Sequence, residues 1–264
     1  DVLRRVESRG KLETARRLRA TLSAVFRYAI ATARLIHDPS AALRGALTSP
    51  VVKHRAAITN ATEFGKLLRA IAKFDGHVQT HIALQLLALT AVRPGELRFS
   101  TWDDFDIDGA IWTIPPSKTK MRRPHMVPLA RQSIVLINEL KAQRRHSAFL
   151  FPSVRSIEQP MSENTLNAAL RRLGFSGDSA TAHGFRSTFS TLANESGKWS
   201  FDGIERALAH VDSDDVRRAY HRGSHWEERV ALSQWYADLL DDIRAMDPTS
   251  SALSGSILRT SQTS

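Results

Sequence analysis

The sequence predicts a mainly helical α+β fold, in which a helical domain with a small three-stranded antiparallel sheet follows part of a second, small helical domain. Two observations support this prediction. Apolar residues recur at helical spacing along most of the 264 residues. Three short strand signals lie near the middle, at 102–107, 110–114 and 125–129, and Asp108-Gly109 between the first two is a strong hairpin turn.

The first predicted helix extends from Lys11 to His37 and ends before Asp38-Pro39. Its apolar face comprises Leu18, Leu22, Val25, Phe26, Ala29 and Ile30. A basic stripe on the opposite face either follows DNA phosphates or is simply solvated. So short a segment buries little by itself. We therefore assign 1–47 to part of a small helical, core-binding type of domain and 48–58 to a linker.

A larger helical domain is predicted over residues 59–246. Thr59 or Asn60 is the expected N-cap of its first helix. Asp202 and Glu205 have the spacing of a capping box for a short helix that ends near His210. The other predicted helices are 61–73, 77–91, 131–145, 163–173, 183–196, 213–221 and 226–246.

Two segments lack helix signals. The loop from Pro115 to Pro124 contains four cationic residues and no acidic residue. Residues 247–264 are rich in serine and threonine and are expected to form a disordered tail.

Composition narrows the classes of function. Lys and Arg number 37 against 27 Asp and Glu, a net charge of +10. Such a chain favours nucleic acid as its partner, although excess charge also simply keeps proteins soluble. The absence of cysteine excludes disulfides, thiolate zinc sites and cysteine nucleophiles. Without an 18-residue apolar run or a secretory signal, we expect a cytoplasmic, nucleoid-associated protein with no membrane partner.

A few polar residues stand in short motifs that suggest chemistry. His183 and Arg186 are three residues apart at the start of a predicted helix, so both project from one face. Alone, this spacing usually describes a solvated surface. It gains weight from Arg93, from Lys120 in the basic loop, and from His210, which Tyr220 follows ten residues later.

In this order and with these spacings, the residues resemble the tyrosine recombinase family, in its prophage and genomic-island integrase branch related to lambda integrase. The resemblance covers nearly the whole chain, including AVRPGELR, KMRRPHMVPL, MSENTLNAALRRLG, HGFRSTFSTL, IERALAHV and VRRAYHR. It implies a site-specific recombinase that cuts and rejoins DNA by transesterification through a 3′-phosphotyrosine, in the integration or excision of a prophage or genomic island. Neither metal, ATP nor another cofactor is expected.

The chemistry explains the tyrosine and the arginines. A tyrosine hydroxyl that attacks a phosphodiester must lose a proton held at a pKa of about 10, and charge gathers on the non-bridging oxygens. Arg93 and Arg186 would clamp these oxygens. Glu96 resembles the acidic residue that supports the first arginine, and it would orient that guanidinium without touching DNA.

A lysine and two histidines would manage the protons. Lys120 would protonate the leaving 5′ oxygen, with Lys118 as the competing candidate. His183 and His210 would hydrogen-bond the phosphate and hold or shuttle the tyrosine proton. His210 also suits a helix C-cap, and the two roles are compatible.

Only three tyrosines compete for the role of nucleophile. Tyr28, on the apolar side of the first predicted helix, and Tyr236, in the last helix, are predicted to pack. Tyr220 lies between Arg218 and Arg222 on a polar, basic helix. Tyr220 is therefore the predicted nucleophile.

DNA contacts outside the reacting centre are expected mostly at phosphates. The candidates are Arg16, Arg17, Arg19, Lys118, Arg122, Arg123, Arg171 and Arg172. The helical arginine pairs equally suit a solvated surface. The resemblance implies double-stranded attachment-site DNA as partner, a homotetramer on that DNA and an accessory directionality factor. The apolar residues of the last helix, Trp226, Val230, Trp235, Leu239 and Ile243, suit either docking between neighbours or the protein's own core.

Two rival functions remain open. One is a type IB topoisomerase, which shares the chemistry, and the other is a non-catalytic DNA-binding remnant of an integrase. Integrases of this branch usually begin with a further DNA-binding domain, so we expect a fragment or a remnant of a larger gene. The pairs His77/His81 and His221/His225 have helical spacing but lack the glutamate of a zinc protease motif. No metal site is expected.

Overall fold

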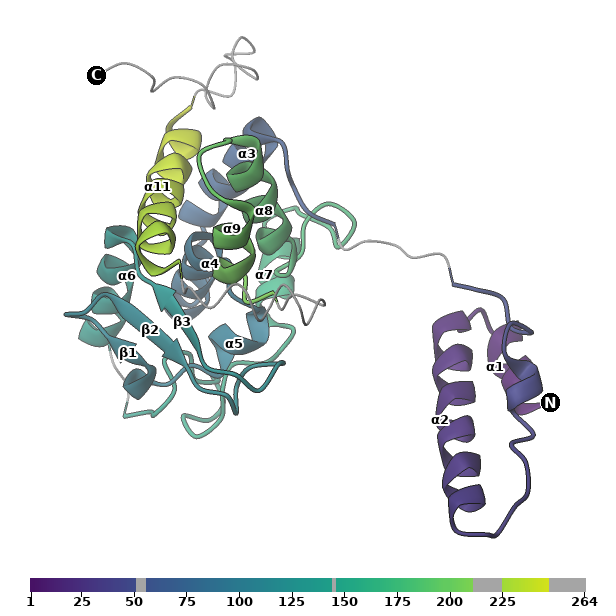
Figure 1. The fold of residues 1–264 in the computed structure, drawn as a ribbon. Coiled ribbons are helices and arrows are strands. Elements are labelled where there is room, and N and C mark those ends of the chain that lie inside the picture. Colours follow the sequence, from purple (N-terminus) through teal and green to yellow (C-terminus); the bar gives the residue numbers. More distant parts are fainter. Residues whose placement is uncertain (51–55, 144–145, 211–224, 247–264) are drawn as a thin grey trace. The chain divides into compact units, whose positions relative to one another are not determined.

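The computed structural model describes residues 1–50, 56–143, 146–210 and 225–246 (Figure 1). The chain divides into two compact units, residues 1–54 and 55–264. Helices dominate both units, and a three-stranded antiparallel sheet belongs to the second. The predicted fold class is confirmed.

The first unit pairs α1 (Val2–Ser8) with α2 (Leu12–Ala31), followed by a 3-10 turn, η1 (Ala41–Leu43). Sequence analysis did not predict α1. Leu3 and Ala15 are the buried apolar side chains of these helices.

The prediction of one long helix over 11–37 is wrong at its C-terminal end. After Ala31, Ala33 adopts a left-handed conformation with φ 56, and the N–H of Arg34 donates to the carbonyl of Ala29 at 2.8 Å. This bond and the left-handed residue form a Schellman ending, in which the left-handed position is usually occupied by glycine. With alanine there, the sequence gives no stop before Asp38-Pro39.

The expected packing of Tyr28 is also wrong. Its side chain is 66% exposed, and Val25 is 57% exposed. The other residues of the predicted apolar face are half-buried. A two-helix unit has too few residues to cover a whole helix face.

The second unit begins with three helices and a 3-10 turn and continues through the sheet into further helices. They are α3 (Ala61–Ala72), α4 (Val78–Thr90), α5 (Pro94–Arg98), η2 (Trp102–Asp104), α6 (Arg131–Ala142), α7 (Thr165–Arg172), α8 (Gly184–Glu195), α9 (Phe201–Ala207) and α11 (Trp226–Ala245). Asn60 is the N-cap of α3, and its side chain accepts from the N–H of Glu63 at 3.1 Å. Of the two predicted N-caps, Thr59 and Asn60, the second is therefore confirmed.

The sheet has the order β1-β2-β3, with β1 (Phe105–Asp106), β2 (Ile111–Ile114) and β3 (His125–Pro128). All neighbours are antiparallel. Trp112 on β2 lies opposite both Phe105 and Val127. The predicted first strand is shorter than expected, because η2 occupies its beginning.

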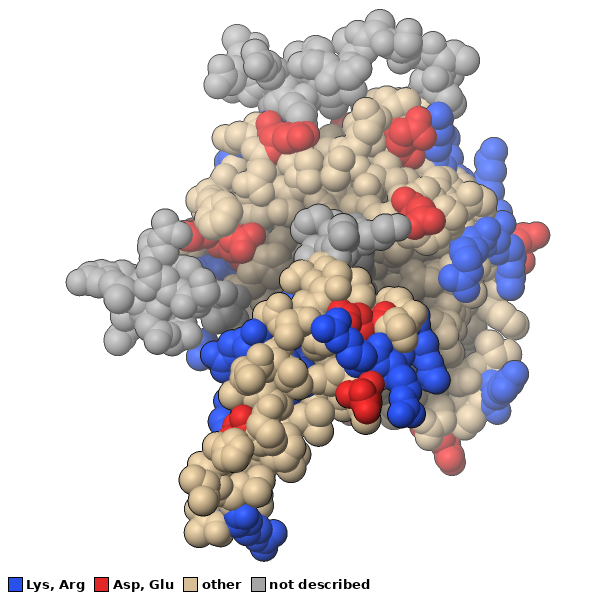
Figure 2. Space-filling model, turned by 90° about the vertical axis from the view of Figure 1, so that its right-hand side faces the viewer, with Lys and Arg blue, Asp and Glu red and all other residues tan. Residues whose placement is uncertain are grey.

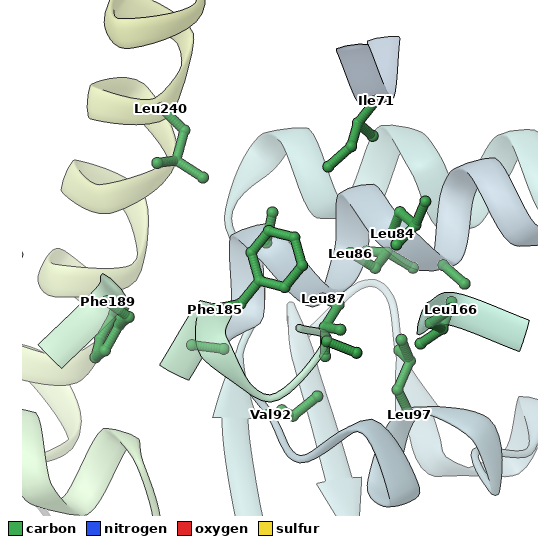
Figure 3. Close-up of a cluster of buried hydrophobic side chains, with 14 of the residues drawn as sticks. Ile71, Leu84, Leu86, Leu87, Val92, Leu97, Leu166, Phe185, Phe189 and Leu240 are labelled. Carbon is green, nitrogen blue, oxygen red and sulfur yellow. The ribbon is translucent and has the colours of Figure 1, made fainter. Parts of the chain in front are cut away.

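The core of the second unit surrounds α4, which contacts α3, α6, α7 and α11. Figure 3 shows Leu86 and Leu87 of α4 near Phe185 of α8, while Phe189 of α8 lies closer to α11, the helix that bears Leu240. α4 is buried on most sides because its sequence from Ile82 to Leu89 is nearly all apolar.

Helix α11 contributes to this core. Tyr236 is fully buried, with its ring centroid 4.7 Å from that of Phe189, and burial raises the pKa of its phenol. Leu239 and Ile243 are also buried, whereas Val230 is 43% exposed. Packing is therefore the role of Tyr236, as predicted.

Two further helix predictions concern the start of α9 and residues 213–221. The capping box of Asp202 and Glu205 is wrong, because Ser200 is the N-cap of α9 and accepts from the N–H of Gly203 at 3.0 Å. The helix predicted over 213–221 lies outside the described residues.

The surface carries the basic excess of the sequence. Figure 2 shows lysine and arginine side chains covering more of the displayed face than acidic ones. Among the described residues, the helices are too short or too polar to cross a membrane.

Candidate active site

Arg93 and Glu96 form the first part of the site, at the start of α5. Arg93 is the N-cap, and Pro94 begins the helix with a backbone suited to that position. The carboxylate of Glu96 turns back and accepts from the Arg93 backbone N–H at 2.9 Å and from its guanidinium at 2.8 Å. Glu96 is 2% exposed, so the carboxylate that holds Arg93 lies in the protein interior.

Arg186, in the first turn of α8, is the second part. It is 5% exposed, and its guanidinium donates to the carbonyls of Ala91 at 2.8 Å and Leu208 at 2.5 Å. Burial first, and the charge of Arg93 next, lower the pKa of Arg186 to about 10. These described partners are neutral, so an anion that reaches Arg186 would relieve the cost of its burial.

The start of α8 is held closely against the segment before α3. A Cβ on Gly184 would lie 2.4 Å from the carbonyl oxygen of Ala56. The hydroxyls of Thr181 and Thr188 donate to the carbonyls of Ala56 and Ile58. Glycine beside His183 therefore permits this contact, which fixes the helix turn that bears Arg186.

His210 contacts Arg186 and Glu205. Its Nε2 lies 3.1 Å from a guanidinium nitrogen of Arg186, and its Nδ1 lies 2.9 Å from the carboxylate of Glu205. Arginine can only donate, so Nε2 accepts and Nδ1 carries the proton given to Glu205. This network defines one tautomer of His210.

The turn after α9 holds both arginines. The carbonyl of Leu208 accepts from Arg186, and the next carbonyl, of Ala209, accepts from Arg93 at 3.2 Å. Ala209 is left-handed, with φ 49, and the backbone N–H of His210 donates to the backbone carbonyl of Glu205 at 2.9 Å, as in a Schellman ending. Unpaired carbonyls at a helix C-terminus favour cations. Two guanidiniums thus share one anchoring turn.

We expect Ala209→Gly to raise the free energy of unfolding by up to about 1 kcal/mol, because glycine has no left-handed penalty but gains freedom in the unfolded chain. Urea unfolding measures the change. Ala70→Gly, in the interior of α3, is the control and should destabilise by about 1 kcal/mol. Equal destabilisation by both substitutions would contradict the strain assigned to Ala209.

The two candidate lysines have different surroundings in the loop before β3. Lys118 Nζ lies 2.6 Å from the carboxylate of Asp104 and 2.9 Å from the hydroxyl of Thr101. Lys120 is exposed. Buried Thr119 fastens the loop, because its hydroxyl donates to the carbonyl of Arg123 at 2.7 Å. The ion pair of Lys118 favours Lys120 as the lysine that reaches a substrate.

The other predicted site residues are less fully defined. His183 is half-buried at the N-cap position of α8. Tyr220 lies outside the described residues. The structure therefore brings together Arg93, Glu96, Arg186 and His210, and says nothing of the predicted nucleophile.

Sequence analysis missed His125, the first residue of β3. It is 7% exposed, in spite of its polar ring. Burial first, then the charges of Arg229, Arg186 and Arg93, lower its pKa to about 3. The alternation of the strand offered a signal, since His125 shares the inward face with Val127.

This low pKa predicts sensitivity to acid. Below pH 6.5 the unfolded chain binds a proton at His125, whereas the folded protein stays neutral there until about pH 3. The free energy of unfolding therefore falls by about 1.4 kcal/mol per pH unit as the pH falls through this window, and His125 contributes no slope above it. Urea unfolding between about pH 4 and 7 measures how the free energy of unfolding changes with pH. This dependence should be weaker in His125→Gln than in the wild type, by the equivalent of one proton. Equal slopes would contradict the prediction.

The candidate DNA contacts are mostly exposed. Arg16, Arg17, Arg122, Arg123, Arg171 and Arg172 lie on the surface, whereas Arg19 is half-buried. Arg17 also pairs with Glu13 at 2.8 Å. Their exposure permits contact with phosphates.

The described members of the two histidine pairs belong to no metal cluster. His77 is the N-cap residue of α4, and His225 pairs with Glu228 at 2.9 Å. His221 lies outside the described residues. No group of three or more potential ligands occurs in the part of the chain that the structure describes.

Sequence comparison accounts for this arrangement. The model of the phage integrase family matches residues 58–225, which include every predicted catalytic position. The chain belongs to the phage integrase family. The model of the phage integrase central domain matches residues 1–46.

Individual integrases agree with this membership. The integrase of Enterobacteria phage P4 is 38% identical over 255 residues, covering 90% of this chain and 57% of its own length. The prophage integrase IntZ of Escherichia coli K12 is 39% identical over 233 residues, covering 88% of this chain and 57% of its own. This chain thus spans less than two thirds of the length of these relatives.

Solved integrases share the fold. A lambda integrase dimer bound to a COC' core site has a TM-score of 0.60 and 23% identity, covering 84% of this chain and 77% of that one. A lambda integrase tetramer bound to a Holliday junction has a TM-score of 0.59 and 22% identity, covering 81% and 63%. At these identities the similarity concerns the fold alone.

Proposed function

We propose that this integrase-family chain cuts and rejoins double-stranded DNA at attachment sites through a 3′-phosphotyrosine at Tyr220. The observation that supports this most is the pair of guanidiniums, Arg93 and Arg186, held on one turn beside His210. Such a pair suits the two non-bridging oxygens of a phosphodiester.

The proposed reaction balances without a cofactor. The Tyr220 oxygen attacks phosphorus and loses its proton to a nearby base, for which His183 and His210 are the candidates. The bond from phosphorus to the 5′ oxygen breaks, and Lys120 protonates that oxygen. Arg93 and Arg186 neutralise the charge on the pentacovalent phosphate, with Glu96 orienting Arg93. The phosphotyrosine conserves the bond energy, so the reverse reaction joins a new strand.

The wider proposal concerns partners. Recombination joins two duplexes, so we propose a homotetramer on attachment-site DNA, an accessory directionality factor and a cytoplasmic location beside the chromosome. Phosphate contacts from the exposed arginines of α2, α7 and the loop before β3 would supply affinity that falls steeply with salt.

Covalent capture tests the function. Nicked duplex fragments that span the source genome are incubated with the protein and with Tyr220→Phe, and the fragments that stay linked to protein after denaturation are sequenced. We expect an adduct at one site with the wild type and complete loss with Tyr220→Phe, because phenylalanine has no hydroxyl.

Three other outcomes would contradict the proposal. DNA binding without an adduct indicates a binding remnant. Adducts throughout plasmid DNA, together with relaxation of supercoils, indicate a type IB topoisomerase. An adduct that Tyr220→Phe still forms assigns the nucleophile to another residue.

A further inference from the structure

Helix α11 is held against β3 by side chains that no step of the reaction above uses. The N-terminal part of the helix lies beside this strand (Figure 1). The guanidinium of Arg229 donates to the carbonyl of Met126, and the hydroxyl of Ser233 donates to the carbonyl of Pro128 at 3.0 Å. Two successive turns of the helix therefore bind two positions of the strand, in the same order along the chain.

The two carbonyls lie on the open edge of the sheet. The sheet ends at β3, which pairs with β2 on one side only. The N–H of Leu129 donates to the carbonyl of Ala110 at 2.9 Å, which continues the ladder between β2 and β3. Residues of an antiparallel strand alternately face the neighbouring strand and face away from it, so the carbonyls of Met126 and Pro128 face away from β2. Helix α11 therefore supplies donors where a further strand would otherwise supply them.

The spacing of the donors on α11 matches that of the acceptors on β3. Four residues of an α-helix rise about 6 Å, and two residues of a strand rise about 7 Å. The two side chains therefore meet the two carbonyls in one register, and a shift of α11 by one turn would break both bonds. A third bond extends this register, because Gln234 Oε1 accepts from the backbone N–H of Arg131, the first residue of α6, at 3.0 Å.

Arg229 is a costly residue to bury. It is 7% exposed, and burial first, then the charge of Arg206, lower its pKa to about 10. Its Nε is buried without a hydrogen-bond partner in the described part of the chain, and its guanidinium carbon lies 5.4 Å from the ring centroid of Trp226. Its described partners, a carbonyl and an aromatic ring, are both neutral. A buried cation with neutral partners adds little stability, so stability alone does not explain Arg229.

Both elements that Arg229 joins adjoin segments of the candidate active site. β3 begins immediately after the loop from Pro115 to Pro124, which bears Lys118 and Lys120. α11 begins six positions after Tyr220 in the sequence. Six residues of chain span at most about 20 Å, so the start of α11 limits where Tyr220 can lie. A fixed register of α11 on β3 therefore limits the separation of the tyrosine and the lysine loop.

We propose that Arg229 is a positioning residue for strand cleavage: with Ser233 it fixes the register of α11 on the edge of β3, and so the reach of Tyr220 toward the lysine loop. Part of this inference rests on the proposed function, since this reach matters to catalysis only if Tyr220 attacks DNA. Because Arg229 is buried, it acts through α11 and not through contact with DNA.

Three variants separate positioning from stability. Arg229→Met removes the donor while filling much of the space, and the loss of a buried charge keeps its cost in stability small. Arg229→Lys keeps one donor for the Met126 carbonyl, which is all that this contact uses. Arg69→Met is the matched control, because Arg69 on α3 donates to backbone carbonyls at the other end of α11, between Ile243 and Met246. Far-ultraviolet circular dichroism and urea unfolding establish that each variant is folded.

The first readout does not need cleavage. The N–H of Arg131 lies in the first turn of α6, where it has no partner within its own helix, and Gln234 on α11 is its acceptor. Hydrogen exchange of this amide, followed by NMR, therefore reports the register of α11, and Gln234→Ala calibrates the unprotected rate.

Exchange should depend on the donor at position 229. We expect Arg229→Met to speed the exchange of the Arg131 amide about tenfold, the scale of one lost hydrogen bond. Arg229→Lys and Arg69→Met should exchange like the wild type. Wild-type exchange in Arg229→Met would overturn the proposal, whether or not the protein cleaves DNA, and so would equal acceleration in Arg69→Met.

The second readout is the single-turnover rate of adduct formation on the nicked duplex that the wild type captures, at saturating protein. A displacement of reacting groups by about 1 Å costs about 10²-fold in rate, so we expect a loss of that order in Arg229→Met with unchanged DNA affinity. Arg229→Lys should recover most of the rate, and Arg69→Met should cleave like the wild type.

The outcomes of this second readout are distinct. A wild-type rate in Arg229→Met would overturn the proposal, as would an equal loss in Arg69→Met. Weaker DNA binding by Arg229→Met would assign Arg229 to the DNA contacts and would overturn it as well. If the wild type forms no adduct but the exchange of the Arg131 amide changes as expected, the proposed function fails and the register of α11 on β3 stands.

Discussion

Arg186→Lys is expected to lower the rate of covalent adduct formation by about 10²–10³-fold, the scale seen when one donor to a developing oxyanion is lost. The guanidinium donates at the same time to Ala91, Leu208 and His210. A lysine ammonium keeps the charge but not the planar fork that makes these bonds and clamps a phosphate. The loss therefore comes from geometry and not from net charge.

Single-turnover capture on a nicked duplex measures this rate, and filter binding at several salt concentrations measures affinity. Arg155→Lys is the control, because Arg155 is exposed, is not among the candidate DNA contacts and undergoes the same change of chemistry. We expect that control to cleave like the wild type. Cleavage by Arg186→Lys at the rate of Arg155→Lys would contradict the role given to the Arg186 guanidinium.

The two lysines of the loop before β3 should separate chemistry from stability. Lys120→Ala is expected to lower adduct formation by about 10²–10⁴-fold, the usual contribution of a general acid, and to leave stability unchanged. Lys118→Ala leaves the carboxylate of Asp104 without its ion pair, so it should cost about 1–3 kcal/mol of unfolding free energy with a smaller effect on the rate.

A modified substrate identifies the acid. When sulfur replaces the leaving 5′ oxygen, the leaving group needs no proton, so Lys120→Ala should recover on that substrate. Lys118→Ala should show no such recovery. Recovery of Lys118→Ala alone would exchange the two assignments.

Much of the second unit was predictable because its helices are long and periodic. The sequence predicted α3, α4 and α11, together with the hairpin at Asp108-Gly109 and the cap at Asn60. Asp106 strengthens that hairpin by accepting from the N–H of Gly109 at 2.9 Å. Local signals sufficed where the local pattern and the packing agree.

The errors occur where alanine replaces a glycine signal or where an element is very short. Ala33, just after α2, and Ala209, in the turn after α9, both adopt left-handed conformations. Alanine rarely adopts this conformation, so its presence in a sequence does not predict one. α5 has only five residues, too few to show a helical period. The shared anchor of the site at the end of α9 was therefore invisible in the sequence, although Arg93 and Arg186, the two side chains that donate to it, were both named.

The direct test of the proposed reaction is the chemical identity and polarity of the covalent bond. A nicked duplex carries separate labels on the strand segments that lie 5′ and 3′ of the break, and the adduct is digested with protease and analysed by mass spectrometry. We predict that a peptide containing Tyr220 is joined to a 3′ phosphate and that the released strand ends in a 5′ hydroxyl. DNA joined through a 5′ phosphate, or to a residue other than Tyr220, would contradict the proposed mechanism.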